Sequence, residues 1–229
     1  IDLERRAKEI TTISEVSRRL SSVLDKQRLL IEVVEQIKSS LDYYHVHIYL
    51  LDKDSGDLIM SGGTGEVGQT MLERKHRISK GRGLVGRAAE SGAPVLVPDT
   101  LKDASWLPNP LLPETASEIA VPILSETGVV GVLDVQNNIQ NSLSDRDVEL
   151  LQSIAYQVSI ALKNADTYME AQSQAERENI INEINRKIQN TSSVEQALQV
   201  AIRELGSTLG AKDSRIVLHL PDSVTKESR

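Results

Sequence analysis

The chain has 229 residues and contains no cysteine. That absence excludes disulfides, thiolate metal sites, cysteine nucleophiles and cofactors linked through a thioether. It also fits a reducing compartment, so we expect a cytoplasmic protein. Phenylalanine is absent as well, and the aromatic side chains are therefore limited to five tyrosines and one tryptophan.

Long apolar runs are also missing, and neither charge sign is concentrated in a block. No run approaches the roughly 20 apolar residues of a membrane span, and the first residues lack a signal-peptide pattern, so we expect no membrane insertion. The net charge of -7 is spread over both signs, whereas nucleic-acid binding requires a basic patch. We therefore expect no nucleic-acid partner. Because the chain opens at Ile1 inside a helical pattern, we expect it to be a piece of a longer protein.

Three stretches have the apolar spacing of helices. Residues 1–24 lack glycine and proline and repeat apolar residues every three or four positions, which predicts an amphipathic N-terminal helix. Asp25 suits the N-cap of a second helix that extends to Leu41. From Ser144 to Asn190 neither glycine nor proline occurs, which predicts one long C-terminal helix.

Between these helices the apolar period changes to two. The alternation over 45–51 and 58–61, separated by turn residues, predicts a β-hairpin, and 119–124 with 129–136 predicts another. Short strands are expected near His76 to Ile78 and at 95–97, with a short helix from Leu84 to Glu90. The predicted fold class is α+β, with a central antiparallel sheet, flanking helices, and long helices at both ends that carry a signal.

The start of the sequence recurs after a shift of 168 residues. The apolar positions of the first helices then align with those of the C-terminal region, and Ile48 and Leu50 align with Ile216 and Leu218. The alternative is that any two amphipathic helices look alike. We predict a signalling helix over 1–24, a domain over 25–168, a helical linker over 169–190, and a second copy over 191–229 that is truncated after its first strand.

Two motifs suggest cofactors but fail on spacing. Gly81-x-Gly83-x-x-Gly86 matches a dinucleotide-binding loop, yet only about seven helical residues precede Val95, too few for a parallel crossover. We therefore expect a tight turn that leads into a short helix, whose N-terminus beside Arg82 and Arg87 leaves room for a small anion. His45 and His47 share one face of a strand but lack a third ligand, so we expect no metal.

Several segments in a fixed order resemble a GAF domain, a small ligand-sensing module of signalling proteins. They are His45–Asp52, Gly81–Ala89, Pro94–Asp99, Ser117–Ile123, Gly131–Gln136 and Ser144–Asp147, and the resemblance covers roughly residues 10–168. It implies an antiparallel sheet of the GAF/PAS type with helices on one face and a loop-closed pocket on the other. It also implies terminal helices that pair across a dimer.

The better-known branches of this family do not match. The methionine sulfoxide reductase branch and the branch that attaches a bilin both need cysteines, which are absent. The cyclic-nucleotide branch carries an Asn-Lys…Phe…Asp-Glu motif, but Asn137-Asn138 has no lysine beside it and the chain has no phenylalanine. Haem would need an axial histidine, for which His47 is the weak candidate. We expect no cofactor.

Strand alternation and the proline-rich loop at 99–115 supply the candidate ligand site. Either Trp106 only anchors this loop on the core, or the loop also forms the wall of the ligand site, and the two interpretations are compatible. A one-residue error in phase would turn every strand side chain to the other face. The predicted ligand-binding residues are His47, Tyr49, Ser61, Trp106, Asn109, Ser117 and Ile119.

The long C-terminal helix has apolar residues with the alternating spacing of a coiled coil. They predict a homodimer contact, and the alternative is that this seam packs against the domain's own sheet. The predicted dimer residues are Leu151, Ala155, Val158, Leu162, Ala165 and Met169.

No catalytic constellation is visible in the sequence, so we do not expect an enzyme. The predicted function is a non-catalytic module that senses an unknown small molecule, forms a homodimer and passes a signal through its helices to an output domain. The alternatives are a ligand-free structural spacer, or a regulatory fragment of a cyclase, a transcription regulator or a histidine kinase of a two-component system.

Overall fold

The computed structural model describes residues 25–190 and 193–208. The helix predicted over 1–24 and the strand predicted around Ile216 and Leu218 lie outside this range. The chain divides into two compact units, one up to Met169 and one from Glu170, and each is described by itself.

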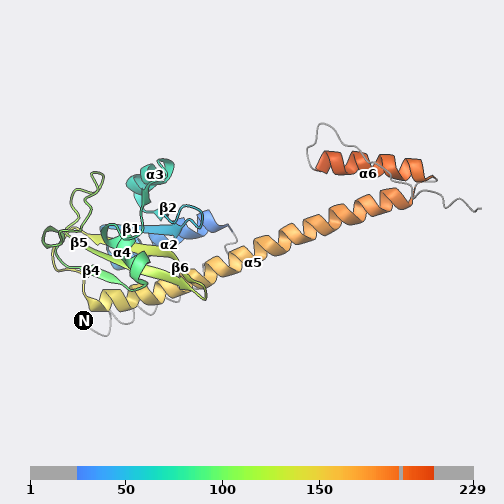
Figure 1. The fold of residues 1–229 in the computed structure, drawn as a ribbon. Coiled ribbons are helices and arrows are strands. Elements are labelled where there is room, and N and C mark those ends of the chain that lie inside the picture. The colour runs from blue at the N-terminus through green and yellow to red at the C-terminus, as the bar shows by residue number, and fades with distance from the viewer. Residues whose placement is uncertain (1–24, 191–192, 209–229) are drawn as a thin grey trace, which may run out of the picture. The chain divides into compact units, whose positions relative to one another are not determined.

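The first unit is built on one six-stranded sheet (Figure 1). Every neighbouring pair is antiparallel, and the order β3-β2-β1-β6-β5-β4 places β1 and β6 at the centre. The antiparallel sheet and both predicted hairpins are therefore confirmed. The strands are β1 His45–Leu51, β2 Leu58–Gly63, β3 Arg77–Ile78, β4 Val95–Val97, β5 Ser117–Ser125 and β6 Gly128–Asn137.

The helices begin where the sequence supplies caps. Asp25 accepts a hydrogen bond of 2.9 Å from the Arg28 backbone N–H at the start of α2. At the start of α5, Ser144 donates from its backbone N–H and hydroxyl to Asp147, whose other oxygen accepts from the Tyr43 hydroxyl at 3.1 Å. The single long helix is confirmed. The helical segments are α2 Lys26–Leu41, α3 Gly65–Glu73, α4 Gly83–Ser91, the 3-10 turn η1 Thr100–Lys102, α5 Asp145–Gln189 and α6 Val194–Thr208.

Helix α3 was not predicted from the sequence. Two glycines, at positions 65 and 68, weaken its helical pattern. Gly68 is nevertheless required, because a Cβ there would lie 2.2 Å from the backbone carbon of Gly63. The close approach of helix and strand selects glycine at this point, and tertiary packing outweighs helix propensity.

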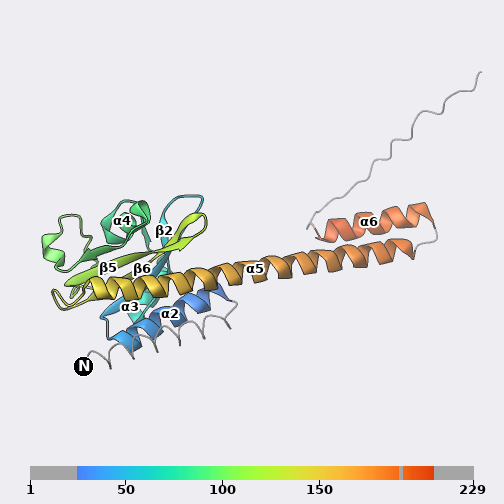
Figure 2. The same ribbon diagram turned by 90° about the horizontal axis from the view of Figure 1, so that it is seen from below.

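Helices α2 and α5 cover one face of the sheet, which we call the helix face (Figure 2). Its core is almost entirely aliphatic, and burial of such side chains contributes roughly 1.5–3 kcal/mol each. Side chains of β1, β5 and β6 meet those of both helices there. The largest fully buried members are Leu29, Leu30, Ile37, Ile48, Ile119, Ile123, Leu133, Leu151 and Ile154.

This packing corrects the predicted dimer contact. Leu151, Ala155, Val158 and Leu162 belong to the core of the helix face, so they are not available to a second chain. Ala165 is buried as well, whereas Met169 is 58% exposed. A coiled-coil spacing and the seam of a helix on its own sheet are alike in sequence, because both need a narrow apolar stripe.

Helices α3 and α4 pack on the opposite face, which we call the pocket face. Its apolar cluster is smaller and contains side chains of both helices together with Tyr49, Met60 and Ala120 of the sheet. Trp106 packs against this cluster from the loop between β4 and β5. The sheet is thus covered on both faces, but by different kinds of side chain.

In the second unit, α6 lies beside the last turns of α5. Lys187 of α5 pairs with Glu183 of its own helix and with Glu204 of α6, both at 3.0 Å. The Ser193 hydroxyl accepts from the Gln196 backbone N–H and so caps α6. Within the described range, no helix combines the length and the apolar character that crossing a membrane requires.

Candidate ligand pocket

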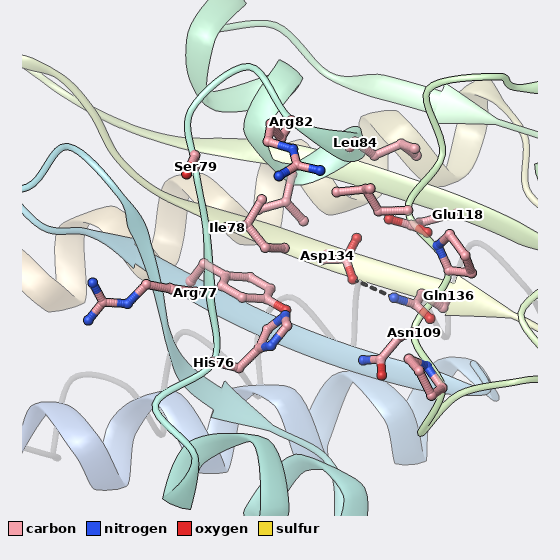
Figure 3. Close-up of a pocket in the computed structure, with 16 residues that line it drawn as sticks. His76, Arg77, Ile78, Ser79, Arg82, Leu84, Asn109, Glu118, Asp134 and Gln136 are labelled. Carbon is pink, nitrogen blue, oxygen red and sulfur yellow. Dashed lines mark hydrogen bonds between the residues drawn. The ribbon is translucent and has the colours of Figure 1, made fainter.

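A cavity of about 290 Å³ opens on the pocket face (Figure 3). The central strands form its floor, through Tyr49, Glu118, Asp134 and Gln136. The start of α4 and the segment around β3 form its sides, and the loop between β4 and β5 covers it. These contribute His76, Arg77, Ile78, Ser79, Arg82, Gly83, Leu84, Val85, Leu107, Pro108, Asn109 and Pro110.

The register of the sheet explains why polar side chains gather on the floor. On β6, Asp134 pairs with His47 of β1 on one side and with Ala120 of β5 on the other. Two residues further along β6, Gln136 pairs with Glu118. Because side chains alternate along a strand, residues two apart share a face, so all of these side chains point the same way.

Asp134 is the centre of this polar group. Its Oδ2 lies 3.1 Å from His47 Nδ1 and accepts a 2.9 Å hydrogen bond from Gln136 Nε2. The Thr115 hydroxyl in turn donates to Gln136 Oε1 at 2.7 Å. Asp134 is 1% exposed, and its Oδ1 has no hydrogen-bond partner among the described residues. A buried carboxylate oxygen without a donor is costly.

Glu118 is the second buried carboxyl group of the floor and lies close to Asp134. Burial, and then the neighbouring Asp134 charge, raise the pKa of Glu118 well above its usual range. The Trp106 indole N–H donates to Glu118 Oε2 at 2.8 Å and acts in the opposite direction, but it does not outweigh burial. The neutral acid is therefore favoured at Glu118.

The histidines beside the floor are kept neutral by burial. Burial, and then the nearby His47, lower the pKa of His45 to about 3. The same two causes in the same order lower the pKa of His76. The uncharged imidazole is therefore favoured at His45 and at His76.

The loop above the cavity is fastened at several points. Trp106 ties it to Glu118, and Asp103 pairs with Arg87 of α4 at 2.8 Å. The Asn109 amide donates to the sulfur of Met71 in α3 at 3.2 Å. The loop is thus anchored through Trp106 and also forms a wall of the cavity, so both interpretations of this segment hold.

The glycines at the start of α4 and within it allow a positive φ and close contacts that a Cβ would prevent. Gly83 has a φ of +59°, and a Cβ there would come within 2.9 Å of the Leu107 side chain. A Cβ on Gly86 would lie 2.5 Å from the Ser79 carbonyl oxygen. Strand β4 follows α4 and runs antiparallel to β5. The predicted tight turn into a short helix is confirmed, and the parallel crossover of a dinucleotide-binding unit does not occur here.

Four of the predicted ligand-binding residues lie in or next to the cavity. Tyr49 and Asn109 line it directly. His47 lies beside the floor and contacts Asp134, while Trp106 donates a hydrogen bond to Glu118. Their role in binding a ligand remains a prediction.

The other three predicted residues do not line the cavity. Ser117 and Ile119 face the opposite way: Ile119 belongs to the core of the helix face, and the Ser117 hydroxyl donates to the Ile139 carbonyl. The predicted phase of β5 was one residue off, which exchanges its two faces. Ser61 is the extra residue of a β-bulge opposite Ile48 and Tyr49, and its hydroxyl donates to the Ile59 carbonyl.

The acidic floor was missed by the sequence reasoning. A signal was present, because Asp134 interrupts the apolar run of one strand and Glu118 directly precedes the apolar run of another. A charged residue in the middle of a buried strand is unusual unless it is paired or functional. No group of three or more histidine, aspartate or glutamate side chains in the described ranges has the arrangement of a metal site.

A curled antiparallel sheet with two longer helices on one face, and short helices with a loop-covered cavity on the other, defines a class of small ligand-pocket domains. This chain belongs to the GAF domain family, whose model matches residues 23–163. That match covers the whole described sheet together with α2 and the first part of α5.

Two curated relatives illustrate the membership. The Nif-specific regulatory protein of Azospirillum lipoferum is 31% identical over 133 residues, which are 56% of this chain and 21% of that protein. GAF domain-containing protein A of Dictyostelium discoideum is 30% identical over 125 residues, which are 55% of this chain and 73% of that protein. The chain thus spans about a fifth of the length of the Nif-specific relative.

Solved structures support the fold. A GAF domain of a phosphoenolpyruvate-protein phosphotransferase from Coxiella burnetii has a TM-score of 0.65 at 15% identity, covering 72% of this chain and 98% of that one. A free methionine-R-sulfoxide reductase from Neisseria meningitidis, in complex with its substrate, has a TM-score of 0.62 at 21% identity, covering 70% and 91%. The two structures show that this fold occurs both as a GAF domain of a larger protein and as a free-standing enzyme.

Proposed function

We propose that this chain is a non-catalytic sensing domain of a larger signalling protein, and that a small molecule bound in the cavity is its signal. The observation that carries the proposal is a 290 Å³ cavity whose floor holds two neighbouring buried carboxyl groups, those of Glu118 and Asp134. Such groups are retained at binding sites because they favour a specific ligand at a cost in stability.

The relatives and the composition favour regulation over catalysis. The Azospirillum relative is named as a regulatory protein, and a fly relative as a dual cyclic-nucleotide phosphodiesterase, of which this chain spans 16%. The enzymes of this fold that the chain resembles in structure reduce methionine sulfoxide, a branch that depends on cysteine. This chain has none.

Strand β6 offers a direct route from the pocket to the long helix. Asp134 faces the cavity, whereas its neighbours Leu133 and Val135 face the helix-face core, where Leu151 of α5 also lies. A ligand that shifts β6 therefore shifts the packing under α5. We propose that α5 carries this change toward an output domain as a small rotation or shift of register.

Assembly and domain organisation are part of the same proposal. We propose a cytoplasmic homodimer formed through the helices, using side chains that the core leaves exposed, such as Tyr156, Ile160 and Met169. We further propose that the second unit begins another GAF copy. Helix α6 supports this, because α2 moved by 168 positions would cover 194–209.

A ligand screen on the full 229-residue chain tests the sensing function. Amino acids, amines, dicarboxylates, sugars, nucleotides and cyclic nucleotides are added singly while the melting temperature and the fluorescence of the only tryptophan are followed. A ligand at 100 times its Kd adds about 2.7 kcal/mol to the free energy of unfolding. We expect at least one compound class to stabilise the chain and change the Trp106 signal.

A blocked pocket is the matched control. Ser79→Tyr places a large side chain at the cavity wall and is expected to abolish the stabilisation, whereas Lys53→Tyr in the exposed β1–β2 turn leaves it unchanged. If no compound stabilises the unmodified chain, or if Ser79→Tyr responds as the unmodified chain does, the sensing function is wrong. The domain is then a structural spacer.

A further inference from the structure

The surface beside the cavity carries a local excess of positive charge that the overall composition hides. The chain has a net charge of -7, but between residues 74 and 82 five of nine residues are cationic and none is acidic. The expectation that neither sign forms a block therefore fails here. We call residues 74–82 the basic segment. Its cationic residues are all exposed, and they are Arg74, Lys75, Arg77, Lys80 and Arg82.

Backbone hydrogen bonds fix the basic segment at both ends. The Arg74 backbone N–H donates to the Thr70 carbonyl at 3.1 Å, where α3 ends. In the middle, β3 pairs with β2, and beyond it the Gly81 N–H donates to the Gly86 carbonyl at 2.9 Å. The cationic side chains thus project from a backbone that is ordered before any partner binds, which lowers the entropic cost of docking.

Acidic residues of the chain leave most of this positive charge without a partner. Asp57 lies 3.6 Å from the Arg77 guanidinium, in a partly exposed pair. Glu73 precedes the segment and Glu90 approaches Gly81, but within the described ranges neither forms an ion pair with its cations. The other four cations form no ion pair with any described residue. The segment is therefore open to an anionic partner.

Local structure explains only part of this charge pattern. A cation at the C-terminal end of a helix is favoured by the helix dipole, which accounts for Arg74 and Lys75 after α3. A charge on an edge strand prevents pairing with other chains, which accounts for Arg77 in β3. Arg82 is instead the N-cap residue of α4, and Lys80 lies just before it, at the helix end where a cation is disfavoured. Their presence there needs another cause.

The extent of the basic segment favours a short anionic partner over a large one. A DNA duplex or a membrane of anionic lipids would face much more of the surface, where the excess of acidic residues in this chain repels it. A peptide with several carboxylates can contact the nine residues alone. Arginine side chains also suit carboxylates, because the guanidinium can donate two parallel hydrogen bonds to one carboxylate.

We propose that the basic segment docks an acidic segment of a partner protein, whose carboxylates pair with Arg74, Lys80 and Arg82. This docking does not depend on the proposed sensing function. Arg77, Ser79 and Arg82 also line the cavity, and in Figure 3 the Arg77 side chain extends away from it. A docked segment therefore lies beside the cavity.

Labelled peptides test the docking directly. A short peptide that alternates glutamate with serine is titrated with the full chain at pH 7 while its fluorescence anisotropy is followed. The control peptide has glutamine in place of each glutamate. We expect the acidic peptide to bind at about 20 mM salt and at least about tenfold more weakly at about 300 mM, because salt screens exposed charges. No binding of the acidic peptide, or equal binding of both peptides, would overturn the proposal.

A double neutralisation locates the contact. Arg74→Gln with Lys80→Gln removes two exposed cations that do not line the cavity and have no ion pair in the described ranges. We expect an unchanged melting temperature and peptide binding weakened about three- to tenfold. Arg177→Gln with Arg203→Gln, at exposed positions of the second unit, removes the same charge and should change the affinity less than about twofold. Equal losses in the two double variants would show that the basic segment is not the site.

Measurements on the unmodified chain test the surface and the class of partner without any variant. The backbone amide NMR signals of residues 74–82 should shift as the acidic peptide is added, and shifts confined to other residues would contradict the assigned surface. A short DNA duplex and vesicles that contain phosphatidylserine are compared at the same salt, and we expect both to bind more weakly than the peptide. Tighter binding of either one would assign the surface to that polyanion and overturn the acidic protein segment.

Discussion

The two faces of one sheet are built on different principles. On the helix face, aliphatic side chains from five elements fill the space between the sheet and α2 and α5. On the pocket face, the same strands present Tyr49, Glu118 and Asp134 toward a cavity under a loop. The alternation of one strand thus supplies a packed core on one side and a polar site on the other.

The helix face contributes most of the stability of the domain, whereas the pocket face holds the candidate ligand site. The helix face contributes burial and leaves little freedom for substitution, because a close-packed interior loses free energy for each group removed. The pocket face contains buried polar atoms without partners among the described residues, at His45, His47 and Asp134. These unpartnered atoms lower the stability of the fold unless a ligand or a water molecule binds to them.

The largest expected effect is a cavity on the helix face. Leu151→Ala removes a fully buried side chain, and we expect a loss of about 2–5 kcal/mol in the free energy of unfolding by urea denaturation. Ile139→Ala, at a 62% exposed position, is the control and should change it by less than about 0.5 kcal/mol. The loss should not depend on protein concentration. A concentration-dependent loss would restore Leu151 as a dimer contact.

The second effect is a pH-dependent loss in the free energy of unfolding, which arises at His45 on the pocket face. His45 has a folded pKa of about 3 and an ordinary pKa of 6.5, so between these values the unfolded chain binds the extra proton. Stability is therefore fully present above about pH 6.5 and falls by up to about 1.4 kcal/mol per pH unit as the pH decreases toward 3.

The variant His45→Asn removes this titration while keeping an acceptor for the Thr64 hydroxyl, which lies 3.2 Å from His45 Nδ1. Its unfolding free energy should decrease less steeply than that of the unmodified chain between pH 6 and pH 4, as measured by denaturation at each pH. Parallel curves for the two proteins would show that His45 is not buried as a neutral imidazole.

Glu118 produces a pH effect of the opposite sign. Its pKa is raised in the folded state, so above the ordinary glutamate range the folded chain retains a proton that the unfolded chain has lost. Stability therefore decreases as the pH rises from that range toward the folded pKa. Glu118→Gln cannot ionise and keeps an acceptor for Trp106. We expect its stability advantage over the unmodified chain to grow from pH 5 to pH 8; a constant difference would contradict the buried acid.

The smallest expected effect is on the loop. Trp106→Phe removes the hydrogen bond to Glu118 but keeps most of the ring packing, and should cost about 0.5–1.5 kcal/mol. Arg87→Ala breaks the partly exposed pair with Asp103 and should cost less than about 1 kcal/mol. In Arg87→Ala, acrylamide quenching of Trp106 should increase if the pair holds the loop closed. Unchanged quenching would show that the Arg87–Asp103 pair does not hold the loop closed.

Much of the fold could be predicted from the sequence because its signals are local. The caps at Asp25 and Ser144, the turn at 52–57 and the change of apolar period mark where elements begin and end, each through contacts within a few residues. The family membership likewise follows from short segments in a fixed order. Helix α3 was not predicted, because Gly68 weakens the local helical pattern and is required only by its close contact with β2.

Some features of the candidate site could likewise be predicted from the sequence, and others could not. The sequence by itself determined that the chain has no thiol chemistry and that a proline-rich loop with one tryptophan precedes β5. Only the tertiary structure decided which face of β5 meets the cavity, that the stripe on α5 packs on its own sheet, and that Asp134 lacks a donor on Oδ1 within the described range. Strand phase, the partner of an apolar stripe and the pairing of a buried charge all depend on residues that are distant in sequence. Those residues come together only when the sheet forms.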